Sequence, residues 1–351
     1  MNSLGTPAVI GIFAAAAVAT WVAGVYLSGT TDVIDDRFNL GEAIGGMILL
    51  GIAGTLPELA ITVSAAIGGH LDIATGNLLG GIAMQTLVLV VLDATSRRKE
   101  PLASLSDSLQ PILEAVLVIL VVTIAIAGPL LSPSTAIGGS VSPASLAIVI
   151  VWLLGMIVLN RVRRGARWEI VKVARTAKPA PQPIAEKDGG GRFANAKTST
   201  ALLVFGAGAA VTLFAGVMLE RTGNELADRA GINGAIFGAT VLAAVTALPE
   251  ISTGIAAVRL GKVGLAMGDI FGGNAIQVTL FLLADLLAGR PVLNSASPNS
   301  LWLGALGVVV TAVFAGGLII RPPRKWLGVA PASLAVVVLY ILGVIALPFL
   351  K

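Results

Sequence analysis

The chain has 351 residues, of which 56% are hydrophobic and 12% are charged, and its formal net charge is +4. This composition excludes an ordinary soluble domain, because apolar runs of about 20 residues, long enough to cross a bilayer, recur along the whole sequence. The positive charge does not indicate nucleic-acid binding, since the basic residues gather in the loops. Cysteine is absent, which excludes disulfides and thiolate metal sites.

In chain order, the apolar runs predict an all-α membrane protein with ten transmembrane helices. The segment before the first run carries no Lys or Arg, and no convincing cleavage site follows it, so we interpret this run as a retained span and not as a signal peptide. The predicted spans are 8–28, 41–67, 72–92, 109–128, 144–160, 200–219, 232–258, 264–288, 300–320 and 328–349.

A basic, Pro- and Gly-rich segment separates the fifth span from the sixth. We therefore divide the chain into a first repeat (1–160), a linker (161–199) and a second repeat (200–351). The positive-inside rule predicts a cytoplasmic linker, and threading ten spans from it puts 19 of the 23 Lys and Arg residues on that side. Both termini are then expected on the opposite side, and the composition favours a prokaryotic inner membrane.

One motif is written twice in this chain. Residues 54–85 and 246–277 align without a gap at an offset of 192 residues, and 11 of 32 positions are identical. Because each half holds five spans, an odd number, the second half enters the membrane in the opposite direction. The sequence therefore predicts two inverted five-helix repeats, related by a pseudo-two-fold axis in the membrane plane.

Each copy of the motif contains Leu-Pro-Glu near the middle of a predicted span. Pro57 and Pro249 are expected to kink their helices and to free backbone carbonyls one turn earlier. Glu58 and Glu250 are carboxylates at membrane depth, where an isolated charge is costly and usually serves ion handling. Inverted repeats bring the two span centres together, so we expect both glutamates to face one site for a divalent cation, which protons can replace.

The next span of each copy contributes further candidates at matching positions. The side chains of Gln85 and Gln277 offer carbonyl oxygens near the midplane, and Thr55 and Thr246 offer hydroxyls. Asn77 and Asp269 are possible accessory groups, with Asp269 either a third acidic ligand or a charge in the vestibule. Four glycines are expected mainly to allow close helix packing, namely Gly80, Gly81, Gly272 and Gly273.

These residues resemble the cation/calcium exchanger superfamily, which includes sodium/calcium and proton/calcium exchangers. Its two alpha-repeats typically read Gly-Thr-Ser-x-Pro-Glu and Gly-Asn-x-x-Gly-Ser-Asn-x-x-Asn. Here the matching segments are 54–58 with 76–85, and 246–250 with 268–277. The resemblance covers all ten spans and implies a ten-helix fold with alternating access, in which two gating helices slide against the other eight.

Departures from the family pattern bear on the coupling ion. In each copy one of the two hydroxyl residues before the Glu is missing, the family's Ser is Gly81 or Gly273, and its final Asn or Asp is Gln85 or Gln277. The resemblance implies that sodium sites depend on those groups, so their loss favours protons over sodium. Calcium is the expected substrate, since it accepts about 6–8 flexible oxygen ligands, while another cation stays open.

Three alternatives remain at this stage. The first is a calcium/proton antiporter, the second is a sodium/calcium exchanger with the same fold, and the third is a channel or a non-transporting membrane scaffold. No nucleophile and base stand together in the sequence, and His70, the only histidine, is expected to be solvated or interfacial. We therefore predict no enzymatic activity, no cofactor, no nucleic-acid partner and no obligate protein partner. The expected partners are the lipid bilayer and the transported ions.

Overall fold

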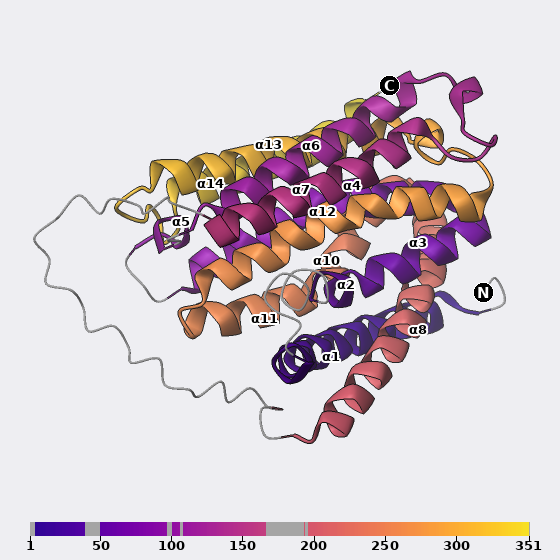
Figure 1. The fold of residues 1–351 in the computed structure, drawn as a ribbon. Coiled ribbons are helices and arrows are strands. Elements are labelled where there is room, and N and C mark those ends of the chain that lie inside the picture. Colours follow the sequence, from indigo (N-terminus) through magenta and orange to yellow (C-terminus); the bar gives the residue numbers. More distant parts are fainter. Residues whose placement is uncertain are drawn as a thin grey trace, which may run out of the picture.

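A computed structural model describes residues 4–38, 50–96, 100–105, 108–165, 193 and 196–350 (Figure 1). Most of the predicted linker, residues 97–99 and part of the second predicted span lie outside these ranges. The described residues form helices joined by turns, with two isolated β-bridges. The α-helices are α1 (Thr6–Phe38), α2 (Leu50–Gly54), α3 (Leu56–Gly68), α4 (Leu71–Thr95), α5 (Leu102–Leu105), α6 (Gln110–Ala127), α7 (Pro143–Gly165), α8 (Thr198–Ala230), α9 (Gly234–Phe237), α10 (Ala243–Thr246), α11 (Leu248–Arg259), α12 (Val263–Ala288), α13 (Pro298–Ile320) and α14 (Pro331–Ala346), and the π-helical turn η4 (Gly238–Leu242) lies between α9 and α10.

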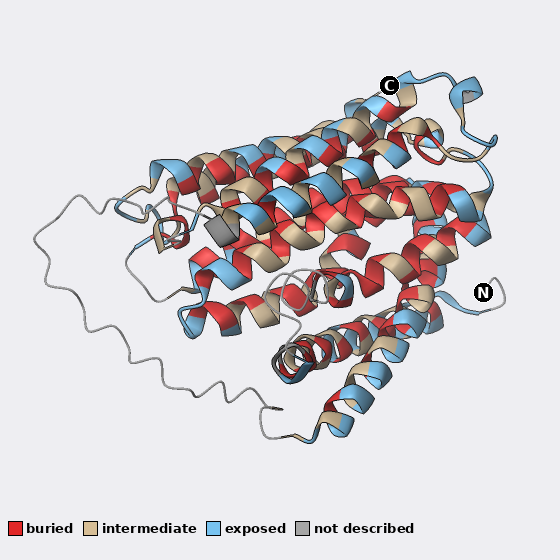
Figure 2. Cartoon of the chain, viewed as in Figure 1, coloured by how far each residue is buried: buried red, intermediate tan, exposed pale blue. Residues whose placement is uncertain are grey.

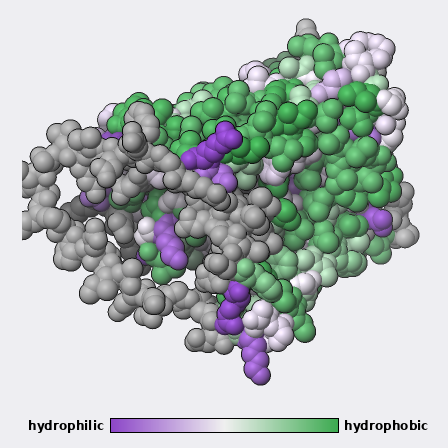
Figure 3. Space-filling model, in the orientation of Figure 1, coloured by the Kyte–Doolittle hydropathy of each residue, from purple (hydrophilic) through white to green (hydrophobic). Residues whose placement is uncertain are grey.

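Among the described residues, seven helices are long and apolar enough to cross a membrane, or eight if one bent pair counts as a span. The seven coincide with predicted spans one, three, four, five, six, eight and nine. The bent pair is Gly234–Thr246 with Leu248–Arg259, at the place of the seventh span. The protein is thus an all-helical integral membrane protein, and much of its visible surface is hydrophobic (green in Figure 3). The count of ten spans stays a prediction.

The helices form two bodies that differ in how they are packed. In Figure 1, α1 and α8 lie together along the lower edge, apart from the stack of α4, α6, α7, α12, α13 and α14. The largest hydrophobic cluster draws on the stack and has no member in α1 or α8. The most apolar windows of α1 and α8 are each 22% buried, as is that of α7, whereas that of α4 is 72% buried. Exposed positions line the outer face of α8 (Figure 2). The α1–α8 pair therefore flanks a separate core.

Reciprocal hydrogen bonds hold α1 and α8 together at both ends. Arg37, at the end of α1, donates to Thr198 Oγ1 at 3.2 Å and to the Ala196 carbonyl at 3.1 Å. At the other end, Arg229 of α8 donates to Thr6 Oγ1 at 3.0 Å and to the Leu4 carbonyl at 2.8 Å. Every residue of the first set is 192 positions from its equivalent in the second.

A second reciprocal arrangement ties the two halves of the stack. Asp285 at the end of α12 accepts the amide of Ser142, which precedes α7, at 2.9 Å. Asp93 at the end of α4 likewise accepts the amide of Ala330, which precedes α14. Both helices open with the same five residues, Pro-Ala-Ser-Leu-Ala, at 143–147 and 331–335. Each carboxylate therefore caps the N-terminus of the last helix of the other half, where the helix dipole favours negative charge.

Candidate functional site

The Leu-Pro-Glu motifs begin new helices inside their spans. A single turn residue interrupts the helix at Thr55, between α2 and α3, and at Ala247, between α10 and α11. Pro57 and Pro249 then stand in the first turn of the new helix, where the missing amide hydrogen costs no hydrogen bond. At the second break, the two helical segments meet at 42°. Each new helix thus places its positive N-terminal end beside the carboxylate of its own motif.

Glu58 and Glu250 occupy the first turns of α3 and α11. They are 1% and 7% exposed, respectively, and in each the Oε2 atom has no hydrogen-bond partner among the described residues. Each carboxylate also bonds its own backbone amide, and the two are close enough for their charges to interact. Two buried carboxylates without a basic partner need neutralisation by a cation or by protons.

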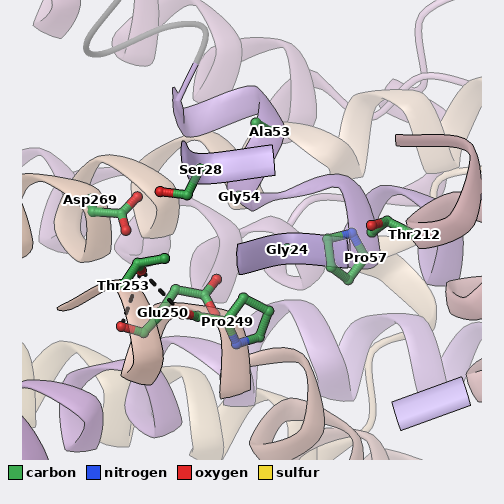
Figure 4. A pocket seen from close by; sticks show the side chains of 10 residues that line it. All are labelled: Gly24, Ser28, Ala53, Gly54, Pro57, Thr212, Pro249, Glu250, Thr253 and Asp269. Carbon is green, nitrogen blue, oxygen red and sulfur yellow. Dashed lines mark hydrogen bonds between the residues drawn. The ribbon is translucent and has the colours of Figure 1, made fainter. Parts of the chain in front are cut away.

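An open pocket adjoins Glu250 (Figure 4). Asp269 of α12 and Ser28 of α1 lie on one side of it, and Pro57 and Thr212 on the other (Figure 4). The Asp269 carboxylate interacts electrostatically with Glu250. The remaining lining residues are Gly24, Ala53, Gly54, Pro249 and Thr253. The wall therefore draws on both motifs and on the α1–α8 pair.

The predicted hydroxyl ligands bond to the backbone in this structure. Thr55 Oγ1 donates to the Gly51 carbonyl at 2.9 Å, and Thr246 Oγ1 donates to the Ala243 carbonyl at 3.2 Å. The Thr246 side chain also contacts the Glu58 carboxylate. Because each hydroxyl uses its hydrogen in the backbone bond, it can offer a lone pair of its oxygen to a cation while it keeps that bond.

Gln85 and Gln277 face each other across the interface of α4 and α12. Gln85 Nε2 donates to Gln277 Oε1 at 3.3 Å, and Gln277 Nε2 donates to the carbonyls of Asn77 and Leu78 at 3.2 and 3.0 Å. The Gln277 carbonyl that we expected to offer to an ion is thus engaged by the equivalent residue of the other half. The ligand roles of both glutamines stay predictions.

Other polar side chains are buried and lack a hydrogen-bond partner among the described residues. Asn77 is one of the predicted accessory groups, and neither of its amide atoms is paired. Sequence reasoning missed Asn274, whose amide atoms are also unpaired, although the family pattern has Asn at this place. It also missed Thr20 and Thr212, two unpaired hydroxyls separated by the same offset of 192. That offset was the available signal.

The four motif glycines differ in their surroundings. A Cβ at Gly80 would lie 2.1 Å from the Ala239 Cβ, so this position has no room for a side chain. A Cβ at Gly81 would lie 2.7 Å from Gln277 Nε2, so a side chain there would displace the Gln277 amide. At Gly272 and Gly273 a Cβ would meet no heavy atom of the described residues within 4 Å. The residue equivalent to Ala239 is Met47, which lies outside the described ranges, so close packing in the second motif stays a prediction.

The described residues contain no group of three or more His, Asp or Glu side chains arranged to hold a metal ion. A transported cation has different needs from a resident metal ion, because it must leave the site as well as enter it. Two carboxylates supplemented by neutral oxygens and water suit that purpose.

Fold and site together define a membrane transporter with paired carboxylates in its core. The family model described as sodium/calcium exchanger protein matches residues 8–160 and 200–347. The chain therefore belongs to this family, within the cation/calcium exchanger superfamily, whose members are secondary transporters and not enzymes. The two matched segments also coincide with the two predicted repeats and leave out the linker.

Relatives agree with this assignment. The chain is 28% identical over 251 residues to the inner membrane protein YrbG of Escherichia coli K12, which covers 70% of this chain and 69% of that protein. It is 24% identical over 277 residues to the putative antiporter CaxA of Alkalimonas amylolytica, with 79% of each chain covered.

Solved structures share the fold at low sequence identity. The H⁺/Ca²⁺ exchanger CAX superposes with a TM-score of 0.65 at 17% identity, covering 97% of this chain and 86% of that one. A structure of the sodium–calcium exchanger NCX_Mj superposes with a TM-score of 0.59, also at 17% identity, covering 99% of this chain and 100% of the other. A proton/calcium exchanger and a sodium/calcium exchanger are thus both similar to this chain in fold. The fold therefore does not distinguish the two coupling ions, and the choice between them depends on the residues of the site.

Proposed function

We propose that this chain is a secondary-active antiporter that exchanges Ca²⁺ for protons across the membrane by alternating access. The observation that carries the proposal is the pair Glu58 and Glu250, both buried, mutually interacting and each with one oxygen unpaired among the described residues. Together they carry two negative charges, which one Ca²⁺ or two protons neutralise. Exchange of one for the other never leaves a bare double charge in the membrane.

The residues around the carboxylates favour protons as the coupling ion. Sodium needs a ring of neutral and charged oxygens beside the calcium position, yet one of the two hydroxyl residues that the family pattern has before each Glu is absent, with Gly54 and Ala247 in those places. Gln277 is held by Gln85 and by the backbone of α4. Protons need no such ring, because the carboxylates themselves accept them. Sodium/calcium exchange is the second candidate, since the similarity in fold extends to the exchanger NCX_Mj.

Inverted repeats are part of the proposal, and reciprocal contacts support them. Gly24 of α1 packs against Pro249, and Gly216 of α8, at an offset of 192, packs against Ala60 and the Pro57 carbonyl. In both cases a Cβ on the glycine would lie 2.6 Å from proline or neighbouring side-chain atoms of the other half. The hydrogen bonds that Arg37 and Arg229 make likewise each join one half to the other, and so do those that Asp93 and Asp285 make. A two-fold axis through the Gln85–Gln277 pair accounts for all of them.

The membrane orientation follows from charge. We infer ten spans, with the linker 161–199 on the cytoplasmic side of a prokaryotic inner membrane and both termini on the opposite side. In this orientation the pocket beside Asp269 faces the cytoplasm. The turn between α3 and α4 faces away from it.

The test is calcium uptake into proteoliposomes that carry either an outward proton gradient or an outward sodium gradient. We expect uptake with the proton gradient, and a fall of about 100-fold or more in Glu58→Gln and Glu250→Gln, because each removes a charged ligand of Ca²⁺. Asp228→Asn is the matched control, since it removes the same charge from an exposed position on α8.

The outcomes separate the candidates. Uptake driven only by sodium would replace proton coupling by sodium coupling. Equal uptake in the wild type and in both Gln variants would show that the two carboxylates do not bind the substrate, and would overturn the proposed site. Absence of calcium flux under either gradient, with another divalent cation transported, would change the substrate and keep the antiport mechanism.

A further inference from the structure

A buried carboxylate links the α1–α8 pair to the core at a place that the transport site does not use. Glu220 of α8 is 1% exposed, and its two oxygens have separate partners on the core. Ser64 Oγ of α3 donates to Oε2 at 2.7 Å, and His70 Nδ1, in the turn after α3, lies 2.7 Å from Oε1. Since a carboxylate only accepts, the imidazole Nδ1 carries the hydrogen.

These three residues lie at the end of α3 that points away from the pocket. Ala53, Gly54 and Pro57 line the pocket, and α3 then runs onward to Gly68. Ser64 is seven residues beyond Pro57, which is about 10 Å along a helix. The His70 side chain is 39% exposed, so it marks the edge of the protein at that end. The cluster therefore closes the side of the site opposite the pocket.

Elsewhere, the contact between the α1–α8 pair and the core consists mostly of small or apolar groups. One further hydrogen bond, from Trp21 Nε1 of α1 to Ser252 Oγ of α11 at 2.6 Å, joins two neutral groups. The two glycine–proline contacts and the small clusters around Ile61 and Leu56 contain no polar bond. Such surfaces slide at little cost, because no directed interaction has to break. The bonds of Glu220 are directed and involve a charged group, so they resist sliding.

The cluster occurs in one half only. The residues equivalent to Glu220, Ser64 and His70 at an offset of 192 are Ser28, Ala256 and Lys262. Ser28 lines the open pocket instead of closing it. The contacts of the scaffold occur in both halves, but the contact of Glu220 with Ser64 and His70 occurs in one. It lies at the end of the site that is closed.

We propose that Glu220, Ser64 and His70 form a latch, a positioning contact that holds the α1–α8 pair in the state that is open at the pocket and closed at the far end. The latch rests on the proposed function, because alternating access requires the α1–α8 pair to move against the core. Release of the latch exposes the far end of α3 and closes the pocket. Glu220 thereby sets the population of the two states without binding the transported ion.

Thiol labelling tests this directly, because the chain has no cysteine. Two single-cysteine reporters are used in nanodiscs, where both membrane faces are accessible to a hydrophilic maleimide. Ser28→Cys reports on the pocket, and Ile61→Cys, at a position that is 0% exposed beside α8, reports on the far end. With the latch intact, we expect fast labelling at position 28 and slow labelling at position 61.

Glu220→Gln keeps the size of the side chain but leaves one of the two donors without an acceptor. We expect the labelling rate at position 61 to rise about tenfold, because one hydrogen bond to a charged group contributes a factor of about that size. The labelling rate at position 28 is expected to fall. Asp228→Asn on the same helix is the matched control and leaves both rates unchanged. If Glu220→Gln fails to fold, His70→Ala takes its place, because it changes a partly exposed turn residue. We expect it to shift both labelling rates in the same directions.

Unchanged labelling at both reporters in Glu220→Gln, or in His70→Ala where Glu220→Gln does not fold, would overturn the latch. A rise at position 61 that also occurs in Asp228→Asn would overturn it as well, since loss of charge alone would then explain the change. The readout needs no ion transport. Failure of calcium uptake would therefore count against the proposed function, and unchanged labelling against the latch.

Discussion

The two halves of this transporter agree in the contacts that build the scaffold and differ at the two ends of the path through the site. Arg37 and Arg229, and Asp93 and Asp285, make equivalent bonds across the halves. At one end of the site, however, Asp269 replaces an asparagine, and at the other the contact of Glu220 has no equivalent. In the proposed mechanism, the repeated residues make two states available that a pseudo-two-fold axis relates, and the unrepeated residues set which of the two is occupied.

The largest expected effect concerns the caps on α7 and α14, where the two halves are nearly but not fully alike. Asp93 accepts the Ser333 hydroxyl and the amides of Ala330 and Leu102, and it also forms an ion pair of 3.5 Å with Lys325. Asp285 accepts the amides of Ser142 and Val292. At the offset of 188 that aligns residues 143–147 with 331–335, the position equivalent to Lys325 is Ile137, which is apolar. Asp93→Asn leaves a partly buried lysine without its charge partner.

We therefore expect Asp93→Asn to lower the free energy of unfolding by about 3–5 kcal/mol and Asp285→Asn by about 1–3 kcal/mol. The measurement is thermal unfolding of the purified protein in detergent. Equal losses in the two variants would show that the ion pair with Lys325 adds nothing to the cap.

A second prediction uses the motif glycines. Gly80→Ala puts a methyl group 2.1 Å from the Ala239 Cβ, which forces α4 away from η4. We expect a loss of about 1–3 kcal/mol in stability, as for other overpacked sites. Gly316→Ala in α13 is the matched control, because nothing among the described residues lies within 4 Å of its Cβ. There the better helix propensity of Ala should give a gain of up to about 1 kcal/mol. A neutral Gly80→Ala would contradict the close approach.

A third prediction makes the two ends of the site alike. Asp269→Asn gives the second motif the residue that the first motif has at Asn77. Because Asp269 lies on the pocket wall and interacts with Glu250, its charge attracts the incoming cation without being essential for its binding. We expect the KM for Ca²⁺ to rise about threefold to tenfold, equivalent to about 1 kcal/mol of attraction in a hydrated pocket, with the maximal rate retained. A complete loss of transport would make Asp269 a direct ligand.

Much of this organisation could be predicted from the sequence, because membrane helices and repeats leave local signals. The offset of 192 between Glu58 and Glu250 identified the paired carboxylates before any contact was known. The breaks at Thr55 and Ala247 follow from the prolines two residues later, and at the second break the two helical segments meet at 42°, which is a kink of the kind expected at Pro249.

What the sequence does not reveal depends on contacts between distant segments. His70 is predicted to be solvated or interfacial, and it is partly exposed in the structure. Its bond to Glu220 joins residues 150 positions apart and has no equivalent in the other half that the sequence could reveal. The engagement of Gln277 by Gln85 is likewise a matter of how closely α4 and α12 approach. The Pro-Ala-Ser-Leu-Ala repeat was within reach of the sequence, but its offset of 188 differs from that of the main motif.

The smallest expected effect concerns the arginine bonds between α1 and α8. Arg37 and Arg229 are both exposed, and hydrogen bonds at exposed positions contribute little, so we expect Arg37→Ala and Arg229→Ala each to cost less than about 1 kcal/mol of stability. If the two contacts only join α1 to α8, both variants leave the labelling of Ser28→Cys and Ile61→Cys unchanged, because the pair still moves as one body. A shift at either reporter would mean that the ends of α1 and α8 separate during the transition, and the transporter would then have three moving parts instead of two.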